Sequence, residues 1–503
     1  MPRIVGRIGA AALFSSVASF SWADVTPEEV WQDWKDYSAR FGQTVETGSE
    51  TRTGETLTVG DIRMTMEMSD GSKFSSQLGD LDLRQLGDGS VAIDMGVSQV
   101  MSIAIEMSGE PPIEMDLVFD QEGLEVIASG NPGEISYDLR GKRLTVSSDS
   151  VTEGGETFPL SLMLSMSKIA GSYNLSGKGE AIQSELSAAE LAVDLSMSDP
   201  DGGEGELLLN ATLQDVVSSS IGIVPAQIAT GDLAAMLAAG FSSEGTFTHN
   251  GSQFSFSFED GSENAFIEGS SGAGALDFAM TEKMMRYGGS NRDVSFQMSG
   301  SDIPVPVVAM SMQESAFATQ MPIGASEEPE DFSMLLRLVG LEINEGVWGL
   351  FDPGQQLPRD PATLVLDITG KGNLFFDMFD PEQAAMMGDE VPGELHEMTL
   401  NDLTLSLAGL RLNGMGGFTF DNEDLVTFDG MPAPSGSANF RLEGLNAFLD
   451  TLVGMGLMPE DQAMGTRMML GMFAAPGETE DTLVSVIEVT EEGAVMANGQ
   501  RLR

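Results

Sequence analysis

The stretch that decides the fold is Ile62-Arg63-Met64-Thr65-Met66-Glu67-Met68, in which apolar and polar residues alternate without a break. The same alternation recurs in Met101-Ser102-Ile103-Ala104-Ile105-Glu106-Met107 and in Ile113-Glu114-Met115-Asp116-Leu117. Successive side chains of a β-strand point to opposite faces, so a period of two predicts strands with one buried face. Further segments of this kind lie at 160–166, 191–197, 206–213, 254–258, 362–369, 398–407 and 417–420.

Turn signals separate these strands, among them Asp70-Gly71, Asp88-Gly89, Asn131-Pro132-Gly133 and Asp201-Gly202. No helical crossover of a dozen residues lies between the strands, so we expect them to pair in sequence as antiparallel meanders. We also expect Asn250-Gly251 to form a tight hairpin turn. The glycine runs 269–274 and 414–417 lack the spacing of a phosphate or dinucleotide loop and are interpreted as loops or bends between strands.

Helical patterns are few and short. Thr26-Pro27-Glu28-Glu29 predicts a helix start with a capping box, and the apolar stripe Val30, Trp31, Trp34, Tyr37 and Phe41 predicts a helix that docks on the protein's own sheet. Further helices are expected at 232–239, at 332–338 after an acidic linker at 325–330, and at 445–453 and 460–473. A closing hairpin is expected through 483–489 and 495–502.

These patterns predict a mainly β protein with a few helices (α+β), built as an elongated, twisted antiparallel meander sheet with helices packed on it. We divide the chain into a signal peptide (1–23), an N-terminal helix (24–48), a first antiparallel β region (49–230), a helix plus second β region (231–325), and a C-terminal β region (326–503) with a helical pair at 445–473. The length of 503 residues allows two or three domains or one elongated body.

The N-terminus has the features of a cleaved export signal. Arg3 and Arg7 precede a short apolar run, and Ser21-Trp22-Ala23 supplies small residues before a cleavage point at Ala23/Asp24. The apolar run is too short to span a membrane, which needs about 20 residues, and no later segment is long enough either. We therefore expect a periplasmic protein without a transmembrane segment in its mature chain.

The composition is strongly acidic and lacks cysteine. The formal net charge is −54, and cleavage of the signal would remove Arg3 and Arg7 and no acid, which makes it −56. Such a charge repels nucleic acid and anionic lipid head groups, so we expect no nucleic-acid partner. Solubility is the simpler explanation of the acidity. The absence of cysteine excludes disulfides, thiol nucleophiles and thiolate metal sites.

No motif predicts catalysis or metal binding. With only His249 and His396, a histidine-based triad or multi-histidine metal site is nearly excluded, and both are expected to be solvent-facing or at strand edges. The clusters Asp199-Pro200-Asp201-Gly202 and Asp421-Asn422-Glu423-Asp424 are interpreted as solvated turns, with calcium binding as the alternative. We therefore name no catalytic, cofactor-binding or metal residue, expect no cofactor, and leave ligand-binding residues unassigned.

Short motifs in the second half indicate a family resemblance. The run Gly349-Leu350-Phe351-Asp352-Pro353, the segment 357–364, Phe379-Asp380-Pro381 and the closing segment 497–502 resemble an exported alphaproteobacterial family known as domain of unknown function 2125, over most of the mature chain. This resemblance implies no activity and no catalytic residues. The β-meander texture is more weakly similar to the AsmA-like envelope proteins, a likeness of fold that implies little about function.

Two functional hypotheses of different class follow. The first is a non-enzymatic envelope protein whose curved antiparallel sheet binds an apolar, lipid-like ligand or a protein partner. It draws on the uneven distribution of phenylalanine, since 20 of the 26 lie at or after Phe241, although plain packing is the simpler reading of that asymmetry. The alternative is a hydrolase that uses paired carboxylates on an envelope glycan.

Overall fold

The computed structural model describes residues 24–503 apart from 69–70, 178–179, 200–202, 204, 226–231, 381–382, 384 and 386–390. The expected signal peptide at 1–23 lies outside the described residues. So do Asp70, the Asp201-Gly202 turn and three residues of the acidic cluster at 199–202. No helix within the described ranges is long and apolar enough to cross a membrane.

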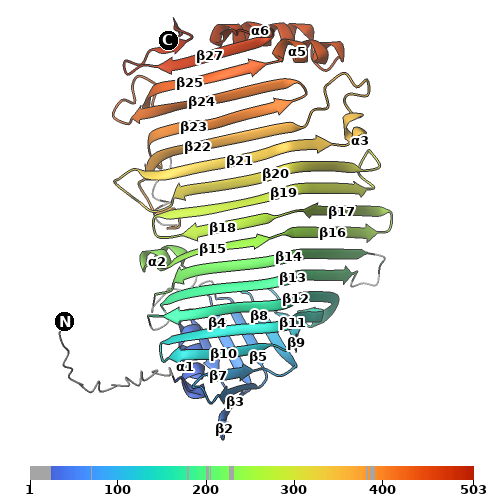
Figure 1. Ribbon diagram of the computed structural model, residues 1–503, viewed down its shortest axis with the longest axis vertical. Coiled ribbons are helices and arrows are strands. Elements are labelled where there is room, and N and C mark those ends of the chain that lie inside the picture. The colour runs from blue at the N-terminus through green and yellow to red at the C-terminus, as the bar shows by residue number, and fades with distance from the viewer. Residues whose placement is uncertain are drawn as a thin grey trace, which may run out of the picture.

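A single antiparallel sheet contains the twenty-nine strands of the described residues (Figure 1). The first ten are β1 (Gln43–Glu46), β2 (Ser49–Thr53), β3 (Thr56–Gly60), β4 (Ile62–Glu67), β5 (Lys73–Leu78), β6 (Leu81–Gln85), β7 (Val91–Asp94), β8 (Ser98–Glu106), β9 (Ile113–Glu122) and β10 (Glu125–Asn131). The next ten are β11 (Glu134–Glu153), β12 (Glu156–Ser176), β13 (Ala181–Ser198), β14 (Glu206–Ile223), β15 (Ser242–His249), β16 (Gly251–Asp260), β17 (Glu263–Ser271), β18 (Gly274–Met280), β19 (Met284–Gly300) and β20 (Val308–Pro322). The last nine are β21 (Glu330–Ile343), β22 (Ala362–Leu374), β23 (Gly393–Leu407), β24 (Leu410–Asp421), β25 (Ala433–Glu443), β26 (Ala475–Pro476), β27 (Thr482–Val489), β28 (Val495–Ala497) and β29 (Gln500–Arg501).

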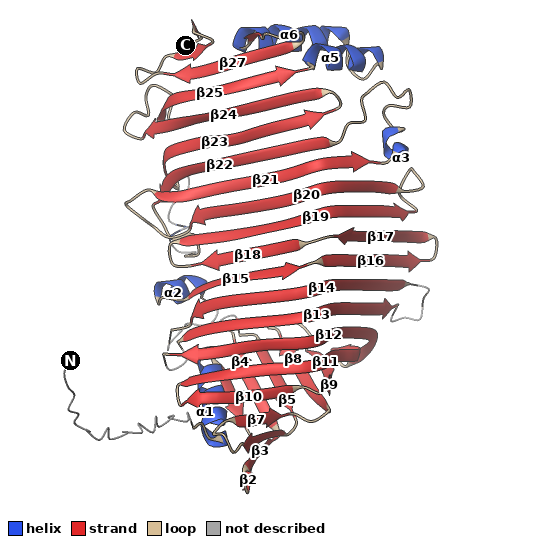
Figure 2. Cartoon of the chain, in the orientation of Figure 1, coloured by secondary structure: helices blue, strands red, loops and turns tan. Residues whose placement is uncertain are grey.

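The described helices lie near the ends and edges of this sheet (Figure 2). They are α1 (Pro27–Arg40), α2 (Leu233–Ala238), α3 (Glu345–Trp348), α5 (Leu445–Gly454) and α6 (Glu460–Phe473). The predicted fold class is therefore confirmed: strands pair mostly with their neighbours in sequence, and helices pack on the sheet. The sheet is continuous across the expected boundaries at 230/231 and 325/326, because β14 pairs with β15 and β16, and β20 pairs with β21.

The sheet forks at its N-terminal end. One half of β11 pairs with β10, from Glu125↔Arg140 to Asn131↔Glu134, and its other half pairs with β9. From β10 the pairing continues through β7, β6, β3 and β2, and from β9 through β8, β5, β4 and β1. Helix α1 packs on both branches, since its Val30 and Trp31 share one buried cluster with Leu83 of β6 and Ile62 of β4.

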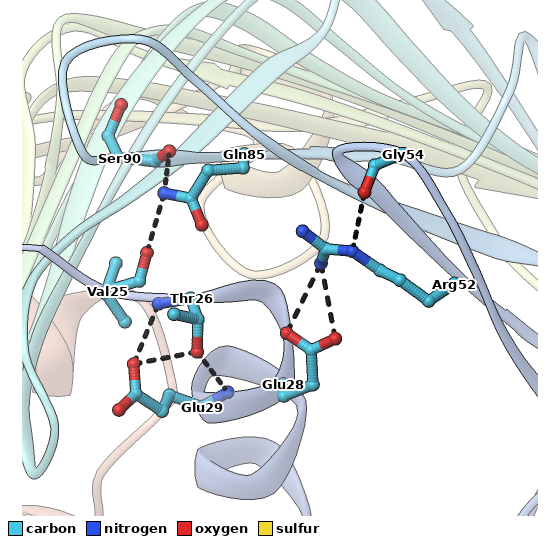
Figure 3. Close-up of polar contacts among 8 residues, drawn as sticks. All are labelled: Val25, Thr26, Glu28, Glu29, Arg52, Gly54, Gln85 and Ser90. Carbon is cyan, nitrogen blue, oxygen red and sulfur yellow. Dashed lines mark hydrogen bonds and ion pairs between the residues drawn. The ribbon is translucent and has the colours of Figure 1, made fainter.

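The start of α1 is fixed by the predicted capping box (Figure 3). The Thr26 N–H donates to the Glu29 carboxylate at 2.8 Å, and the Glu29 N–H donates to Thr26 Oγ1 at 3.3 Å. Gln85 Nε2 donates to the Val25 carbonyl at 2.9 Å, which ties the residue before the cap to β6. The expected docking of the helix stripe on the protein's own sheet is confirmed, because Val30 and Trp31 are buried there.

A line of irregular residues crosses the long strands. Lys168 of β12, Asp215 of β14, Asp293 of β19 and Gly340 of β21 have φ of 50°, 50°, 50° and 67°, and the flanking registers place them at matching positions along their strands. We call this line the crease. On β12, Phe158, Leu160, Leu162, Leu164 and Met166 are even-numbered, whereas Ile169, Tyr173 and Leu175 are odd-numbered. Strand β12 therefore consists of two amphipathic segments that meet at the crease.

The expected hairpin at Asn250-Gly251 was wrong. Strands β15 and β16 meet at Asn250 on the crease, and both pair with β14 in one continuous register. The Asn250 N–H donates to the Gln214 carbonyl at 2.9 Å, so the partner strand holds both sides of the break. Asn-Gly interrupts the strand here without reversing its direction.

The expected helix at 332–338 was also wrong, because these residues belong to β21. The helix was expected from the spacing of Phe332, Leu335, Leu336 and Leu338. Phe332, Leu336 and Leu338 also fit an alternating period, and pairing with β20 and β22 selects the strand. The acidic segment 325–330 leads directly into this strand and is held to the sheet, since the Ser326 N–H donates to the Leu374 carbonyl at 3.0 Å. The helices expected near 232–239, 445–453 and 460–473 are confirmed as α2, α5 and α6, and β27 pairs with β28 in the closing hairpin.

Candidate functional site

The sheet has one apolar face and one polar face, and the difference persists from strand to strand. Residues paired directly across neighbouring strands lie on the same face. One such row, from β12 to β20, consists of Leu164, Val193, Ala211, Phe254, Gly269, Phe296 and Met310. The next row, on the opposite face, consists of Ser165, Ala192, Thr212, Gln253, Ser270, Ser295 and Ser311. We call the first side the apolar face and the second the polar face.

The apolar face continues on the other side of the crease. There a row from β18 to β25 consists of Leu276, Gly289, Phe317, Leu336, Leu366, Leu403, Gly414 and Phe440. Helix α1 packs on this same face at one end, through Tyr137 and Leu175. Helices α5 and α6 pack on it at the other end, through Leu442 and Leu483.

Glycines on the apolar face make room for phenylalanine rings. The ring of Phe278 lies over Gly245, where an added Cβ would come within 2.6 Å of the ring, and Phe317 lies over Gly289 at 2.8 Å. The same arrangement joins Phe254 to Gly269, Phe332 to Gly370 and Phe440 to Gly414. All five pairs are directly opposite in the ladder, so each ring spreads over the neighbouring backbone.

These pairs correct the interpretation of both glycine runs. Gly269 belongs to β17 and Gly414 to β24, so the expectation of loops or bends between strands was wrong at these positions. Several of the phenylalanines that are concentrated after Phe241 belong to these pairs. Packing alone does not account for it, because Phe254, Phe278 and Phe317 remain 39%, 42% and 41% exposed. Among the described helices, α1, α5 and α6 pack on the apolar face at its two ends, and α3 packs beside Ile343 where β21 ends.

The N-terminal end of the apolar face is closed by α1 and an aromatic cluster. Trp34 lies 6.4 Å from Tyr137 and Tyr37 lies 6.1 Å from Tyr173, measured between ring centroids. Tyr137 Oη donates to Asp33 Oδ2 at 3.0 Å. Burial raises the pKa of Asp33, and the hydrogen bond from Tyr137 opposes that rise only in part. Burial likewise raises the pKa of Tyr137, so its hydroxyl keeps its proton.

The C-terminal end of the apolar face leads into a cleft of about 490 Å³, which we call the terminal cleft. Leu341 and Ile343 of β21 form one wall, and Trp348 of α3 with Phe448 and Leu452 of α5 form others. Asn344 positions α3, since its Nδ2 donates to the Val307 carbonyl at 2.9 Å.

A buried ion pair holds the loop that borders this cleft. Asp352 is 1% exposed and accepts the N–H groups of Gln356 and Leu357, each at 2.9 Å. Arg359 Nη1 donates to Asp352 Oδ2 at 2.6 Å, and its guanidinium lies 4.1 Å above the Trp348 ring. Desolvation opposes ionisation of Asp352, but the two N–H groups and Arg359 outweigh it and hold the pKa of Asp352 below its usual range.

A larger hollow, of about 910 Å³, lies at the fork of the sheet. Its lining comes mostly from the polar face of β4, β5, β8 and β9, and includes Thr65, Gln77 and Asp116. Basic Arg63 and Lys73 and acidic Glu67 and Glu114 also line it. Charges of both signs with many hydroxyl groups are typical of a solvated surface, so this hollow is a weaker candidate than the apolar face.

The residues singled out in the sequence lie apart from one another. His249 is buried beside Gly274 in a strand paired on both sides, so the expectation of a solvent-facing position was wrong. His396 Nε2 shares a 2.8 Å hydrogen bond with Asn373 Oδ1. Asp424 accepts the N–H groups of Val426 and Thr427 at 3.0 Å, as in a capped turn. In the ranges that the structure describes, no group of three or more acidic or histidine side chains could hold a metal ion.

The sequence did not identify the residues of the apolar face as a site. Their period of two was recognised, but the pairing that gathers five rings over five glycines depends on register, which alternation alone does not define. A signal that could have found them is the occurrence of glycine within otherwise alternating strands, such as Gly289 and Gly370, since glycine in a strand often marks a close approach.

Comparisons with known proteins give one match. Neither the curated proteins nor the solved structures contain a match to the chain. The matching family model begins at residue 286 and so covers a shorter part of the chain than the resemblance implied. It includes the loop held by Asp352 and the terminal cleft. Over residues 286–500 the chain matches domain of unknown function 2125, a family of uncharacterized proteins conserved in bacteria, which confirms the resemblance predicted from the sequence.

Proposed function

We propose that this protein is a non-enzymatic component of the bacterial envelope that binds the fatty chains of a lipid-like ligand along the apolar face. The observation that supports this most is the set of phenylalanine rings spread over glycines, of which Phe254, Phe278 and Phe317 stay about two-fifths exposed in the folded chain. An ordinary sheet with one apolar face buries it against a second layer. Here the packed helices α1, α5 and α6 lie at the ends of the face.

The energetics favour a flexible apolar occupant. Each square ångström of apolar surface removed from water contributes about 25 cal/mol. A fatty chain that crosses the rings of Phe254 and Phe296 would cover apolar surface that is exposed to solvent in the folded protein. The rings lie over glycines, which have no side chain of their own to project beside them. A fatty chain can therefore bind along this face without pockets that match its shape.

A peptide strand is a less suitable occupant. Strand addition needs a free sheet edge of several residues, and an apolar face offers no backbone hydrogen bonds. The edges of this sheet are short: β28 has three residues and β29 has two at one end, and at the forked end β1 has four and β2 has five. Short edge strands discourage pairing with another chain.

The expected export signal at 1–23 supports a periplasmic location for this binding. A periplasmic binder would meet membrane lipids without a membrane span of its own. The acidic charge of −54 disfavours adsorption to anionic lipid surfaces, so binding would have to depend on the fatty chains.

Lipid extraction tests the proposal directly. The full-length chain, expressed in a bacterial envelope and purified without detergent, should release lipid that mass spectrometry detects at a fixed ratio to protein. A stripped sample should then take up a neutral fatty alcohol that has a pyrene label. A protein that carries no lipid and takes up no fatty alcohol would refute the proposal.

A further inference from the structure

The terminal cleft is continuous with the apolar face. Ile343 pairs with Met310, which belongs to the same cross-strand row as Phe296, and Leu341 pairs with Ala362. A fatty chain lying on that row therefore reaches the cleft without crossing a polar strip. The volume of about 490 Å³ falls within the range of about 300–1000 Å³ that is typical of small-molecule sites.

The charges that line the terminal cleft do not balance. Glu345 and Asp360 contribute carboxylates to this side of the sheet, whereas Glu342 is paired with Ser311 and lies on the polar face. Arg359 is the one basic residue among the described lining residues. Arg359 is already bound to Asp352 at 2.6 Å and to Glu345 at 3.3 Å, and it lies over Trp348. An anionic head group would therefore meet repulsion from carboxylates and find no available cation, whereas a positive head group would be attracted.

We infer that the terminal cleft binds one fatty chain of an amphiphile whose head group is positively charged, with the chain between Trp348 and α5 and the head group beside Asp360. This inference rests on the proposed function, because the chain is the same one that the apolar face accommodates. It adds a place for the end of the ligand and a preference for the charge of its head.

The position of Trp348 in the cleft wall provides a direct assay. A bromine atom at the end of a fatty chain quenches an indole that it touches. The probes are 12-bromododecyltrimethylammonium and 12-bromododecyl sulfate, both titrated below their micelle concentrations against the full-length protein. The expected result is quenching by the cationic probe at concentrations at least about tenfold lower than by the sulfate, and loss of that quenching in Trp348→Phe.

Two variants keep the test independent of folding. Leu452→Phe adds a ring to the cleft without adding an indole and should weaken quenching of Trp348. Asp360→Asn leaves the shape unchanged and should reduce the preference for the cationic head to about threefold or less. Equal binding of the two probes, or quenching that persists in Trp348→Phe, would overturn the inference.

The failure of this inference can be told apart from failure of the proposed function. If lipid co-purifies with the protein but the cationic probe does not quench Trp348, the apolar face binds chains and the terminal cleft does not. If neither lipid nor probe binds, both proposals fail together.

Discussion

Replacement of one exposed phenylalanine on each face of the sheet tests the proposed binding surface. Phe254 of β16 and Phe266 of β17 lie on adjacent strands, and each is 39% exposed. Phe254 points to the apolar face, over Gly269. Phe266 points to the polar face, where its direct partners are Ser257 and Ser299. The two residues are therefore matched in type, exposure and strand position and differ in the face they occupy.

The expected effect of Phe254→Ser follows from the area that a bound chain would cover. A phenylalanine side chain offers about 200 Å², so the exposed 39% is about 80 Å². At about 25 cal/mol per Å² its coverage contributes about 2 kcal/mol. Since about 1.4 kcal/mol is a factor of ten, Phe254→Ser should weaken binding of a pyrene-labelled fatty alcohol by about 30-fold. Phe266→Ser should leave the dissociation constant within about a factor of two.

Fluorescence titration of the stripped protein measures both constants, and a thermal melt of each variant checks that the sheet is intact. The neutral alcohol removes any effect of the protein's charge. If Phe254→Ser and Phe266→Ser weaken binding equally, or not at all, the apolar face is not where the chain binds.

Four further predictions follow from other parts of the structure. Thr26→Ala removes one side of the capping box and should lower the free energy of unfolding by about 1 kcal/mol in urea titrations; an unchanged midpoint would contradict this. Gly414→Val pushes a side chain into the ring of Phe440 and should cost about 1–3 kcal/mol, part of which Phe440→Ala in the double mutant should restore. Because the pKa of Asp33 is raised in the folded state, the protonated carboxyl stabilises the fold at low pH, and this contribution is lost as the pH rises through the raised pKa. The Asp33→Asn variant should therefore have a higher melting temperature than the parent protein at pH 7. This difference in melting temperature should vanish below pH 4. Amino-terminal sequencing of the periplasmic fraction should begin at Asp24, and a chain that retains Met1 would contradict export by cleavage.

The class of the fold could be predicted because it depends on a local property. The alternation from Ile62 to Met68 predicts which residues share a face of the sheet, and the turn residues 131–133 predict where the chain reverses direction. The capping box at Thr26 is similarly local. Each of these features involves residues within a few positions of one another, so the sequence alone defines them.

The wrong predictions concern segments whose conformation is determined by pairing with neighbouring strands of the sheet. Phe332, Leu336 and Leu338 satisfy two periods, and only β20 and β22 on either side determine which applies. Asn250-Gly251 has the composition of a hairpin turn, yet β14 runs past it and holds both flanking strands. The fork at β11 depends on pairings that skip a strand or more, such as β11 with β9 and β10 with β7. The ring and glycine pairs of the candidate site also depend on strand register, which is why the sequence led to the hypothesis of an apolar ligand without indicating a site.

The acidic composition and the uncovered apolar face are related properties. An exposed apolar surface of this extent is ordinarily a liability, because two copies of the chain could bury their faces against each other. A net charge of −54 opposes that approach, and at physiological salt the repulsion acts within about 8 Å, the distance at which two such faces would begin to meet. A fatty chain without an anionic head is not repelled in this way. The charge would therefore oppose self-association through this surface without opposing the proposed ligand, which gives the acidity a role that involves no cationic protein partner.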